Sequence, residues 1–215
     1  MPLVTFYFDP VSPYAWLAAT ALPRIEQAGA SVALQPVLFA GLLNAHENKG
    51  PAEIPAKRAY LFRDVMRQAA RLGLRFSGPP GHPFNPLLAL RMSIALTDPS
   101  ERRRFALAVM SACWEAGEDV SDSATLSRLA RACALDGDAL LAAAQHSAVK
   151  QRLADETARA VEDGVFGVPS FRLGDELFWG GDRIDALLWR LQGGGIDEPA
   201  LEAFLQRPPL AQRRV

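Results

Sequence analysis

Strand-forming segments occur only near the two ends of this chain, and a long helical stretch separates them. Residues 4–8 are β-branched or aromatic, which is typical of a buried strand. Residues 31–39 alternate in part between apolar and polar side chains and indicate a second strand. The next strand signals come at residues 170–173 and 177–179, and the intervening Gly174-Asp175-Glu176 favours a hairpin turn. The predicted order is therefore β-α-β, a helical block of about 120 residues, and then β-β-α.

The helical signals include their own start and stop residues. Ser12 followed by Pro13 is typical of a helix N-cap and first helical position, so we expect a helix over residues 13–27 that Pro23 kinks or ends early. Pro36 indicates that the second strand is an edge strand or is broken there. Residues 42–55 are loop-like. Further helices are expected over residues 56–72 and 183–191 and near 138–144, and four more should begin at about residues 86, 99, 124 and 147. Asn85, Ser123 and Ser147 are the expected caps, and Gly164 is the expected stop of the helix that begins near residue 147.

The length of 215 residues corresponds to about 1.4 domains at roughly 150 residues each. With 49% hydrophobic residues, the composition is that of a globular protein with a sizeable core. We therefore expect one α/β domain over residues 1–215, interrupted by an all-helical insertion at about residues 42–163. Residues 208–215 are expected to form a loose tail.

Charge and hydropathy argue against several classes of partner. The net charge is −1 and no basic stripe is visible, so nucleic acid is not an expected partner. No stretch approaches the roughly 18–20 apolar residues needed to span a bilayer, and Asp9 interrupts the only early apolar run, so neither a membrane partner nor a secretory signal is expected. Cys113 and Cys133 form no CxxC and, with three scattered histidines, no zinc pattern. We expect a cytoplasmic protein with two free, interior thiols and no metal site.

Three short segments contain residues that could form one site. The first is Phe8-Asp9-Pro10-Val11-Ser12-Pro13-Tyr14-Ala15-Trp16, which places Ser12 between the carboxyl end of a strand and the start of a helix. Ligands of open α/β sheets bind outside the carboxyl ends of strands, and helix N-termini present free N–H groups. Ser12 therefore either donates a hydrogen bond to a bound anion or only caps its helix.

The other two segments follow the helical block. The second segment is Gly164-Val165-Phe166-Gly167-Val168-Pro169-Ser170-Phe171. Its Val168-Pro169, directly before a strand, predicts either a cis proline or an ordinary proline at the start of an edge strand. Trp179-Gly180-Gly181-Asp182-Arg183 opens the final helix. There Asp182 is either an N-cap after a glycine turn or a carboxylate that receives the ammonium group of a ligand.

Together these segments resemble a known family. The order of elements, with Val-Pro before the third strand, resembles the thioredoxin fold, and the helical insertion resembles its DsbA-like branch. Redox members of that branch have CxxC at the start of the first helix, where this chain has Ser12-Pro13-Tyr14-Ala15. Disulfide exchange requires a thiolate nucleophile, so dithiol redox chemistry is excluded at this position.

The serine variant is similar to the kappa-class glutathione transferases and the bacterial 2-hydroxychromene-2-carboxylate isomerases. YFDPVSPYAWLA is similar to the opening motif of both, and Asn48-Lys49-Gly50-Pro51 with Lys57 resembles their NKP…K segment, although Gly50 is an addition to that pattern. Phe84-Asn85-Pro86-Leu87 is similar to the FPxN loop of the isomerases, with the residues in a different order. The resemblance covers nearly the whole chain except the tail.

The resemblance implies glutathione as cofactor. Ser12 is then the catalytic residue, and it donates a hydrogen bond to the glutathione sulfur and favours the thiolate. The backbone of Val168, before a cis Pro169, pairs with the cysteinyl part, and Asp182 holds the γ-glutamyl end. The implied glutathione-binding set is Ser12, Lys57, Val168, Pro169, Trp179, Gly180, Gly181 and Asp182, although Lys57 could equally be a solvated surface lysine.

The implied substrate is a small, flat aromatic carboxylate. Its candidate contacts are Tyr14, Trp16, Asn48, Phe84 and Asn85, and for the aromatic residues plain core packing is an equal alternative. The implied activity is glutathione-dependent cis/trans isomerisation of 2-hydroxychromene-2-carboxylate and trans-o-hydroxybenzylidenepyruvate in aromatic catabolism, through reversible addition of the glutathione thiolate. Two alternatives stay open: a kappa-type transferase or peroxidase that consumes glutathione, and a non-catalytic glutathione-binding protein. The resemblance also implies a homodimer.

Overall fold

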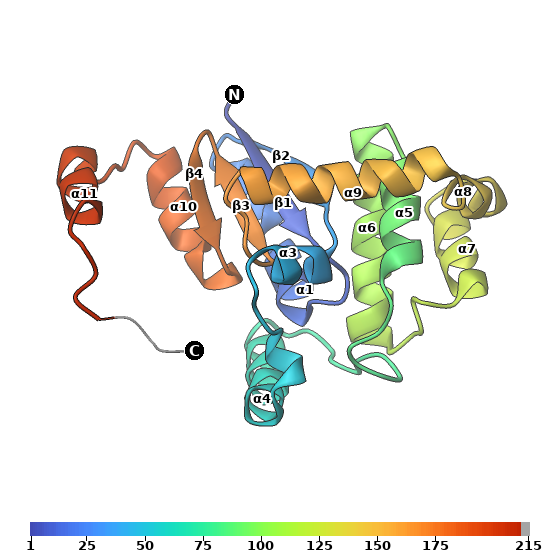
Figure 1. Cartoon of the computed structure of the whole chain (residues 1–215). Coiled ribbons are helices and arrows are strands. Elements are labelled where there is room, and N and C mark those ends of the chain that lie inside the picture. Colours follow the sequence, from blue (N-terminus) through green and yellow to red (C-terminus); the bar gives the residue numbers. More distant parts are fainter. Residues whose placement is uncertain (212–215) are drawn as a thin grey trace.

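A computed structural model describes residues 1–211, which form one four-stranded sheet surrounded by helices (Figure 1). The strands are β1 (Leu3–Phe8), β2 (Ser31–Pro36), β3 (Ser170–Leu173) and β4 (Glu176–Trp179), in the spatial order β2-β1-β3-β4. β1 pairs parallel with β2 and antiparallel with β3, and β3 and β4 form the expected hairpin. The predicted α/β class, with a sheet built from the two ends of the chain, is confirmed.

The central strand β1 is covered on both faces. Val4, Phe6 and Phe8 are almost fully buried in the large core, where the Phe6 ring stacks on Phe171 of β3 with ring centroids 4.8 Å apart. Tyr7, which points to the other face, belongs to a smaller core with residues of the helical block. Because both faces are buried, β1 is held firmly, and the loop that follows it starts from a fixed position.

The helical segment over residues 13–27 is divided into two helices. Ser12 is the N-cap of α1 (Pro13–Ala19), and a second helix, α2 (Leu22–Gln27), follows after a break at Thr20. The proline ring clashes with the carbonyl four residues earlier, so Pro23 is incompatible with a helix that continues through Ala19. This is the early end that Pro23 predicted.

The helical block lies between β2 and β3 in sequence. Its α-helices are α3 (Phe39–Ala45), α4 (Pro55–Arg71), α5 (Leu87–Ala95), α6 (Pro99–Ser111), α7 (Ser123–Ala132), α8 (Gly137–Ala143) and α9 (Ser147–Glu162). After the hairpin come α10 (Ile184–Leu191) and α11 (Glu198–Leu205). In Figure 1, α4 lies below the sheet and α5 to α8 lie to one side of it, while α11 lies beyond α10 on the opposite side. No helix of residues 1–211 is long and apolar enough to cross a membrane.

Two helices were missed in the sequence. The second strand ends at Pro36, and α3 begins at Phe39 within what we expected to be strand and loop. The Phe39 N–H is bonded by Asp9 Oδ2 at 2.9 Å, so the residue that caps this helix lies 30 positions away in sequence. α11 follows a local signal that we did not use, since Asp197 accepts from the Ala200 N–H and Pro199 lies in the first turn.

The predicted helix ends are partly correct. Asp122 and His146, instead of Ser123 and Ser147, occupy the N-cap positions of α7 and α9. Asn85 Oδ1 does accept from the Leu87 N–H at the start of α5. Gly164 follows α9 with φ of +82°, as a stop residue should. Of the predicted tail over residues 208–215, positions 212–215 lie outside the described residues.

Candidate functional site

A cavity of about 1410 Å³ lies where the β1–α1 loop, α3, α4 and the segments flanking the hairpin meet. This volume exceeds the range of about 300–1,000 Å³ that is usual for a single small ligand, so the cavity has room for two molecules side by side. Eleven of the thirteen predicted site residues line it: Ser12, Tyr14, Asn48, Lys57, Phe84, Val168, Pro169, Trp179, Gly180, Gly181 and Asp182. The structure thus brings together residues from both ends of the chain and from the helical block.

Ser12 lies on the cavity wall with its side chain in two long hydrogen bonds. Its Oγ accepts from the Ala15 N–H at 3.3 Å, which is the capping contact, and donates to the Val168 carbonyl oxygen at 3.4 Å. An O–H···O hydrogen bond is normally 2.5–3.0 Å long, so the donated bond is weak. The cap uses a lone pair and leaves the hydroxyl hydrogen available. Capping and donation to an anionic ligand are therefore compatible.

The Val168–Pro169 peptide is cis, one of the two conformations that the sequence left open. The Pro169 carbonyl accepts from the Gly180 N–H at 2.9 Å, which ties this segment to the start of the third motif. Val168 is in the cavity wall, and within residues 1–211 its N–H donates to no protein acceptor. A free backbone N–H beside a cavity is a binding point for an extended peptide.

The third motif forms a short 3-10 turn, and Asp182 does not cap the following helix. Gly180 has φ of +101°, a backbone conformation that favours glycine, and a Cβ there would lie 2.4 Å from Asp182 Oδ1, so any other residue would also displace this carboxylate from its present position. Gly181 packs on Ala18 of α1, which places the motif next to the helix that Ser12 caps. Asp182 is largely exposed and pairs with Arg183 at 3.1 Å, so a ligand ammonium group can reach it.

An aromatic pair borders the same end of the cavity. The rings of Phe166 and Trp179 meet edge to face with centroids 4.9 Å apart, and Trp179 is 53% exposed. A Cβ at Gly167 would lie 2.8 Å from Trp179 Nε1, so this glycine is needed for the close approach. Phe166 and Gly167 belong to the second sequence segment, but the sequence analysis gave neither of them a role in the site.

The opposite wall is polar and basic. Lys57 lies in the first turn of α4, and Asn48 and Lys49 lie in the loop between α3 and α4. The additional Gly50 is accommodated by a turn in which its N–H donates to Glu53 Oε1. No ion pair holds Lys49 or Lys57 among the described residues. Both cations are therefore available to an anionic ligand.

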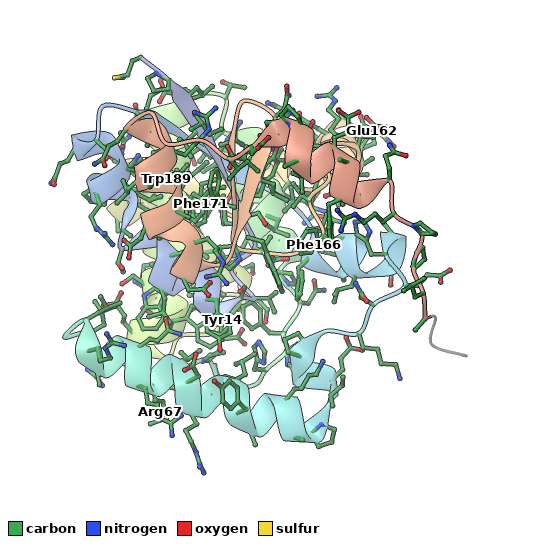
Figure 2. All side chains as sticks on the ribbon, turned by 90° about the vertical axis from the view of Figure 1, so that its left-hand side faces the viewer. Tyr14, Arg67, Glu162, Phe166, Phe171 and Trp189 are labelled. Atoms are coloured by element: carbon green, nitrogen blue, oxygen red, sulfur yellow. The ribbon has the colours of Figure 1, made fainter. Side chains whose placement is uncertain are left out.

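Of the predicted aromatic wall, the structure places Tyr14 and Phe84 at the cavity. Tyr14 donates its hydroxyl to Asp64 Oδ2 of α4 at 3.0 Å, which leaves the ring as the surface that faces the cavity. Burial and the hydrogen bond to Asp64 raise the pKa of Tyr14 above its ordinary range, so the hydroxyl stays protonated. Figure 2 shows Tyr14 between α4 and the body of the protein.

Two predicted residues lie elsewhere. Trp16 is 2% exposed, belongs to the large core and donates to Glu115 Oε1 at 2.9 Å. Asn85 is used at the start of α5 and does not line the cavity. In both cases the structural alternative explains the residue. Cys113 and Cys133 are free and outside the cavity wall, and burial raises the pKa of the Cys113 thiol, so it is unreactive.

Two residues that we did not assign a role support the Ser12 loop. Asp9 is fully buried, and its carboxylate accepts from the Val11 N–H and the Phe39 N–H, both at 2.9 Å. Desolvation raises the pKa of Asp9 to about 7. His82 Nε2 lies 2.9 Å from the Val11 carbonyl oxygen, and burial lowers the pKa of this imidazole. In the sequence, Asp9 and His82 are recognisable only as polar residues that directly precede a proline.

Comparisons with known proteins agree with this arrangement. Residues 3–192 match the family model of the DsbA-like thioredoxin domain. The chain is 28% identical over 187 residues to 2-hydroxychromene-2-carboxylate isomerase from Sphingobium xenophagum, which is 86% of this chain and 95% of that protein. It is 23% identical over 208 residues to glutathione S-transferase kappa 1 from Rattus norvegicus, with 88% and 90% covered. A solved structure of a 2-hydroxychromene-2-carboxylate isomerase superposes with a TM-score of 0.81 at 25% identity, covering 95% of this chain and all of that one.

Proposed function

The chain belongs to the family of DsbA-like thioredoxin domains, and from that premise we propose that it is a glutathione-dependent isomerase of an aromatic carboxylate, of the 2-hydroxychromene-2-carboxylate type. The observation that carries the proposal is Ser12, whose hydroxyl stands at the cavity wall beside Val168, where redox members of the branch have cysteine. The protein's own thiols lie outside the cavity wall, so a thiol for the reaction comes from a bound molecule.

The residues present fit glutathione. The unpaired Val168 N–H and the carbonyl beside it can pair with the cysteinyl part as an added strand does, and Asp182 can receive the γ-glutamyl ammonium group. Trp179, Gly180 and Gly181 shape the surface between them. When bound, glutathione supplies a thiolate that adds reversibly to the conjugated carbon of the substrate, and it is regenerated.

Within this proposal Ser12 keeps the sulfur charged. A hydrogen bond from a hydroxyl to a thiolate is stronger than its long bond to the neutral Val168 carbonyl, because the acceptor is ionised. Asp9 and His82 hold the Ser12 loop by bonds to the backbone of Val11. The hydroxyl of Ser12 is therefore a donor at the cavity wall whose position is fixed by the contacts of its loop with Asp9 and His82.

The substrate would lie against the polar wall of the cavity. Lys57 and Lys49 suit a carboxylate, Asn48 suits a hydroxyl or carbonyl oxygen, and Tyr14 and Phe84 offer flat surfaces to an aromatic ring. We leave Trp16 and Asn85 out of the proposed site. The two free cysteines suit a reducing compartment, which favours the cytoplasm as the location.

A kappa-type transferase is the second candidate, because curated relatives of that class match the chain over most of its length. The transferase consumes one glutathione in each turnover, whereas the isomerase regenerates it. Ultraviolet-monitored interconversion of 2-hydroxychromene-2-carboxylate and trans-o-hydroxybenzylidenepyruvate, with a trace of glutathione, tests the choice. Fast equilibration with full recovery of glutathione supports the isomerase. Consumption of glutathione with an electrophile or peroxide, and no interconversion, would replace it by the transferase. No calorimetric heat with glutathione would exclude both enzymes and the glutathione-binding protein, and would leave only a pure interaction role.

A further inference from the structure

The outer face of α4 has a row of three exposed arginines. Arg63, Arg67 and Arg71 follow one another at intervals of four residues, so they lie on one side of the helix, about 6 Å apart along its axis. In Figure 2, Arg67 points away from the body of the protein. Because three other residues separate its members, this arginine row does not appear as a run of basic residues in the sequence.

The arginine row has no acidic partner in the described part of the chain. Eight arginines elsewhere in residues 1–211 form ion pairs with carboxylates, but no residue of α4 takes part in one. The single acid of α4, Asp64, lines the cavity and accepts hydrogen bonds from Tyr14 and Gln68. The positive charge of the outer face is therefore not compensated locally, although the whole chain has a net charge of −1.

Side chains that are typical of protein interfaces lie beside the arginine row. Tyr60 is 63% exposed and Met66 is 55% exposed. Tyrosine, methionine and arginine are enriched in protein–protein interfaces relative to the rest of the surface, and tyrosine and arginine are frequent among the residues whose truncation weakens binding most. The outer face of α4 thus has the composition of a protein-binding surface with a positive charge.

Two other classes of anionic partner fit this face less well. The apolar residues Leu61, Val65 and Ala69 of α4 are buried, so the outward side has no continuous apolar stripe that could insert into a membrane. A nucleic-acid-binding domain usually has an excess of basic residues, and this chain has none. Carboxylates of another protein remain as the anionic groups that suit the face.

We propose that the outer face of α4 binds an acidic, extended segment of another protein. The carboxylates of this segment pair with the arginine row, and an apolar residue packs against Tyr60 or Met66. Alternate side chains of an extended segment lie about 6.6 Å apart, which is close to the spacing of the arginines. Arginine forms bidentate pairs with carboxylates, so the row recognises their positions as well as their charge.

The predicted complex is transient and independent of the proposed reaction. One face of one helix is small for a protein interface, and exposed ion pairs are screened by salt. Fluorescence anisotropy measures such binding with a labelled peptide in which glutamates alternate with serines around one central leucine. We expect the wild type to bind this peptide with a Kd that rises with salt concentration. The control peptide, with glutamine in place of glutamate, should not bind.

Two double variants with the same change of charge test the location of the surface. Arg63→Glu with Arg67→Glu should raise the Kd for the glutamate peptide at least tenfold, because two attractive contacts become repulsive. Arg104→Glu with Arg152→Glu is the matched control, since these arginines are exposed, outside α4 and without an ion pair among residues 1–211. It should bind as the wild type does. Neither Arg63 nor Arg67 lines the cavity, so turnover and thermal unfolding should stay at wild-type values in both double variants.

Four results would overturn the proposal. The first is that the wild type does not bind the glutamate peptide, and the second is that both double variants lose binding equally, since net charge alone would then explain it. The third is that vesicles of anionic lipid or a single-stranded oligonucleotide displace the peptide from the wild type at lower concentration than unlabelled peptide does, because the face would then bind phosphate groups. The fourth is a lower sedimentation coefficient for Arg63→Glu with Arg67→Glu than for the wild type, which would show that a second copy of the chain covers the face.

Discussion

The hydroxyl oxygen of Ser12 lies 3.4 Å from the carbonyl oxygen of Val168, although 156 residues separate them in sequence. The contact joins the start of the first helix to the cis peptide before β3. β1 is the shared support, because it carries the Ser12 loop at its carboxyl end and pairs directly with β3. The proposed donor to the ligand and the backbone proposed to pair with it are therefore held together by the central sheet.

Replacing this hydroxyl tests its chemical role. Ser12→Ala removes a cap, which costs about 1 kcal/mol of stability, and also removes the proposed donor to the thiolate, so we expect turnover to fall by roughly 100-fold. Asp136→Ala, which removes the cap of α8 far from the cavity, is the matched control. It should unfold earlier but keep full turnover. If both variants lose stability and both stay fully active, Ser12 is only a cap.

The buried carboxyl group of Asp9 predicts a pH-dependent stability. Its pKa is raised from 3.8 to about 7 in the folded chain, so the folded state binds more protons than the unfolded state between these values. The free energy of unfolding should therefore fall as pH rises from about 4 to about 7, by an amount on the order of a few kcal/mol. Urea unfolding across this range measures the slope. Asp9→Asn should flatten it, whereas Asp136→Asn, at an exposed cap, should not, and an unchanged slope in Asp9→Asn contradicts the assignment.

The carboxylate of Asp182 should contribute to glutathione binding and little to later steps. Asp182→Asn keeps the shape of the turn but removes the charge that faces the ammonium group, so the KM for glutathione should rise about tenfold or more with kcat nearly unchanged. Steady-state kinetics with varied glutathione measures both constants. Asp175→Asn, in the β3–β4 turn, provides a carboxylate outside the cavity as control. Equal KM values in the two variants would remove Asp182 from the site.

The lysine on α4 should recognise the charge of the substrate. Lys57→Met should raise the KM for the aromatic carboxylate a few-fold and weaken the dependence of that KM on salt, since exposed charge pairs are modest and screened. Arg67→Met removes a cation from the same helix but outside the cavity wall, and its KM should match the wild type. A wild-type KM and salt dependence in Lys57→Met would show that the lysine is simply solvated.

Local patterns were sufficient for the elements that are stabilised by neighbouring residues. The strands around residues 4–8 and 170–179, the cap at Ser12 and the break before Pro23 each follow from a few adjacent side chains, and each is present in the structure. The cis peptide at Pro169 was one of two conformations that the sequence allowed. These signals placed the segment around Ser12 and the segment around Asp182 correctly within the fold.

Features that depend on distant contacts were not predictable in the same way. α3 starts where Asp9 accepts from Phe39, a contact across 30 residues that no local pattern reports. The same holds for His82, which reaches Val11 from a Gly/Pro-rich loop. Trp16 has the sequence position of a cavity residue, but the side chain packs into the core because helix α1 presents that face inward.

The central claim is that the Ser12 site binds glutathione and holds it as a thiolate. The most direct measurement is the ultraviolet absorbance of the thiolate of bound glutathione, titrated against pH in the wild type and in Ser12→Ala. The account predicts that bound glutathione ionises well below the ordinary thiol pKa of about 8.5 in the wild type and returns toward that value in the variant. Identical titration curves in the two proteins, or a bound thiol that ionises at its ordinary pKa in the wild type, would contradict it.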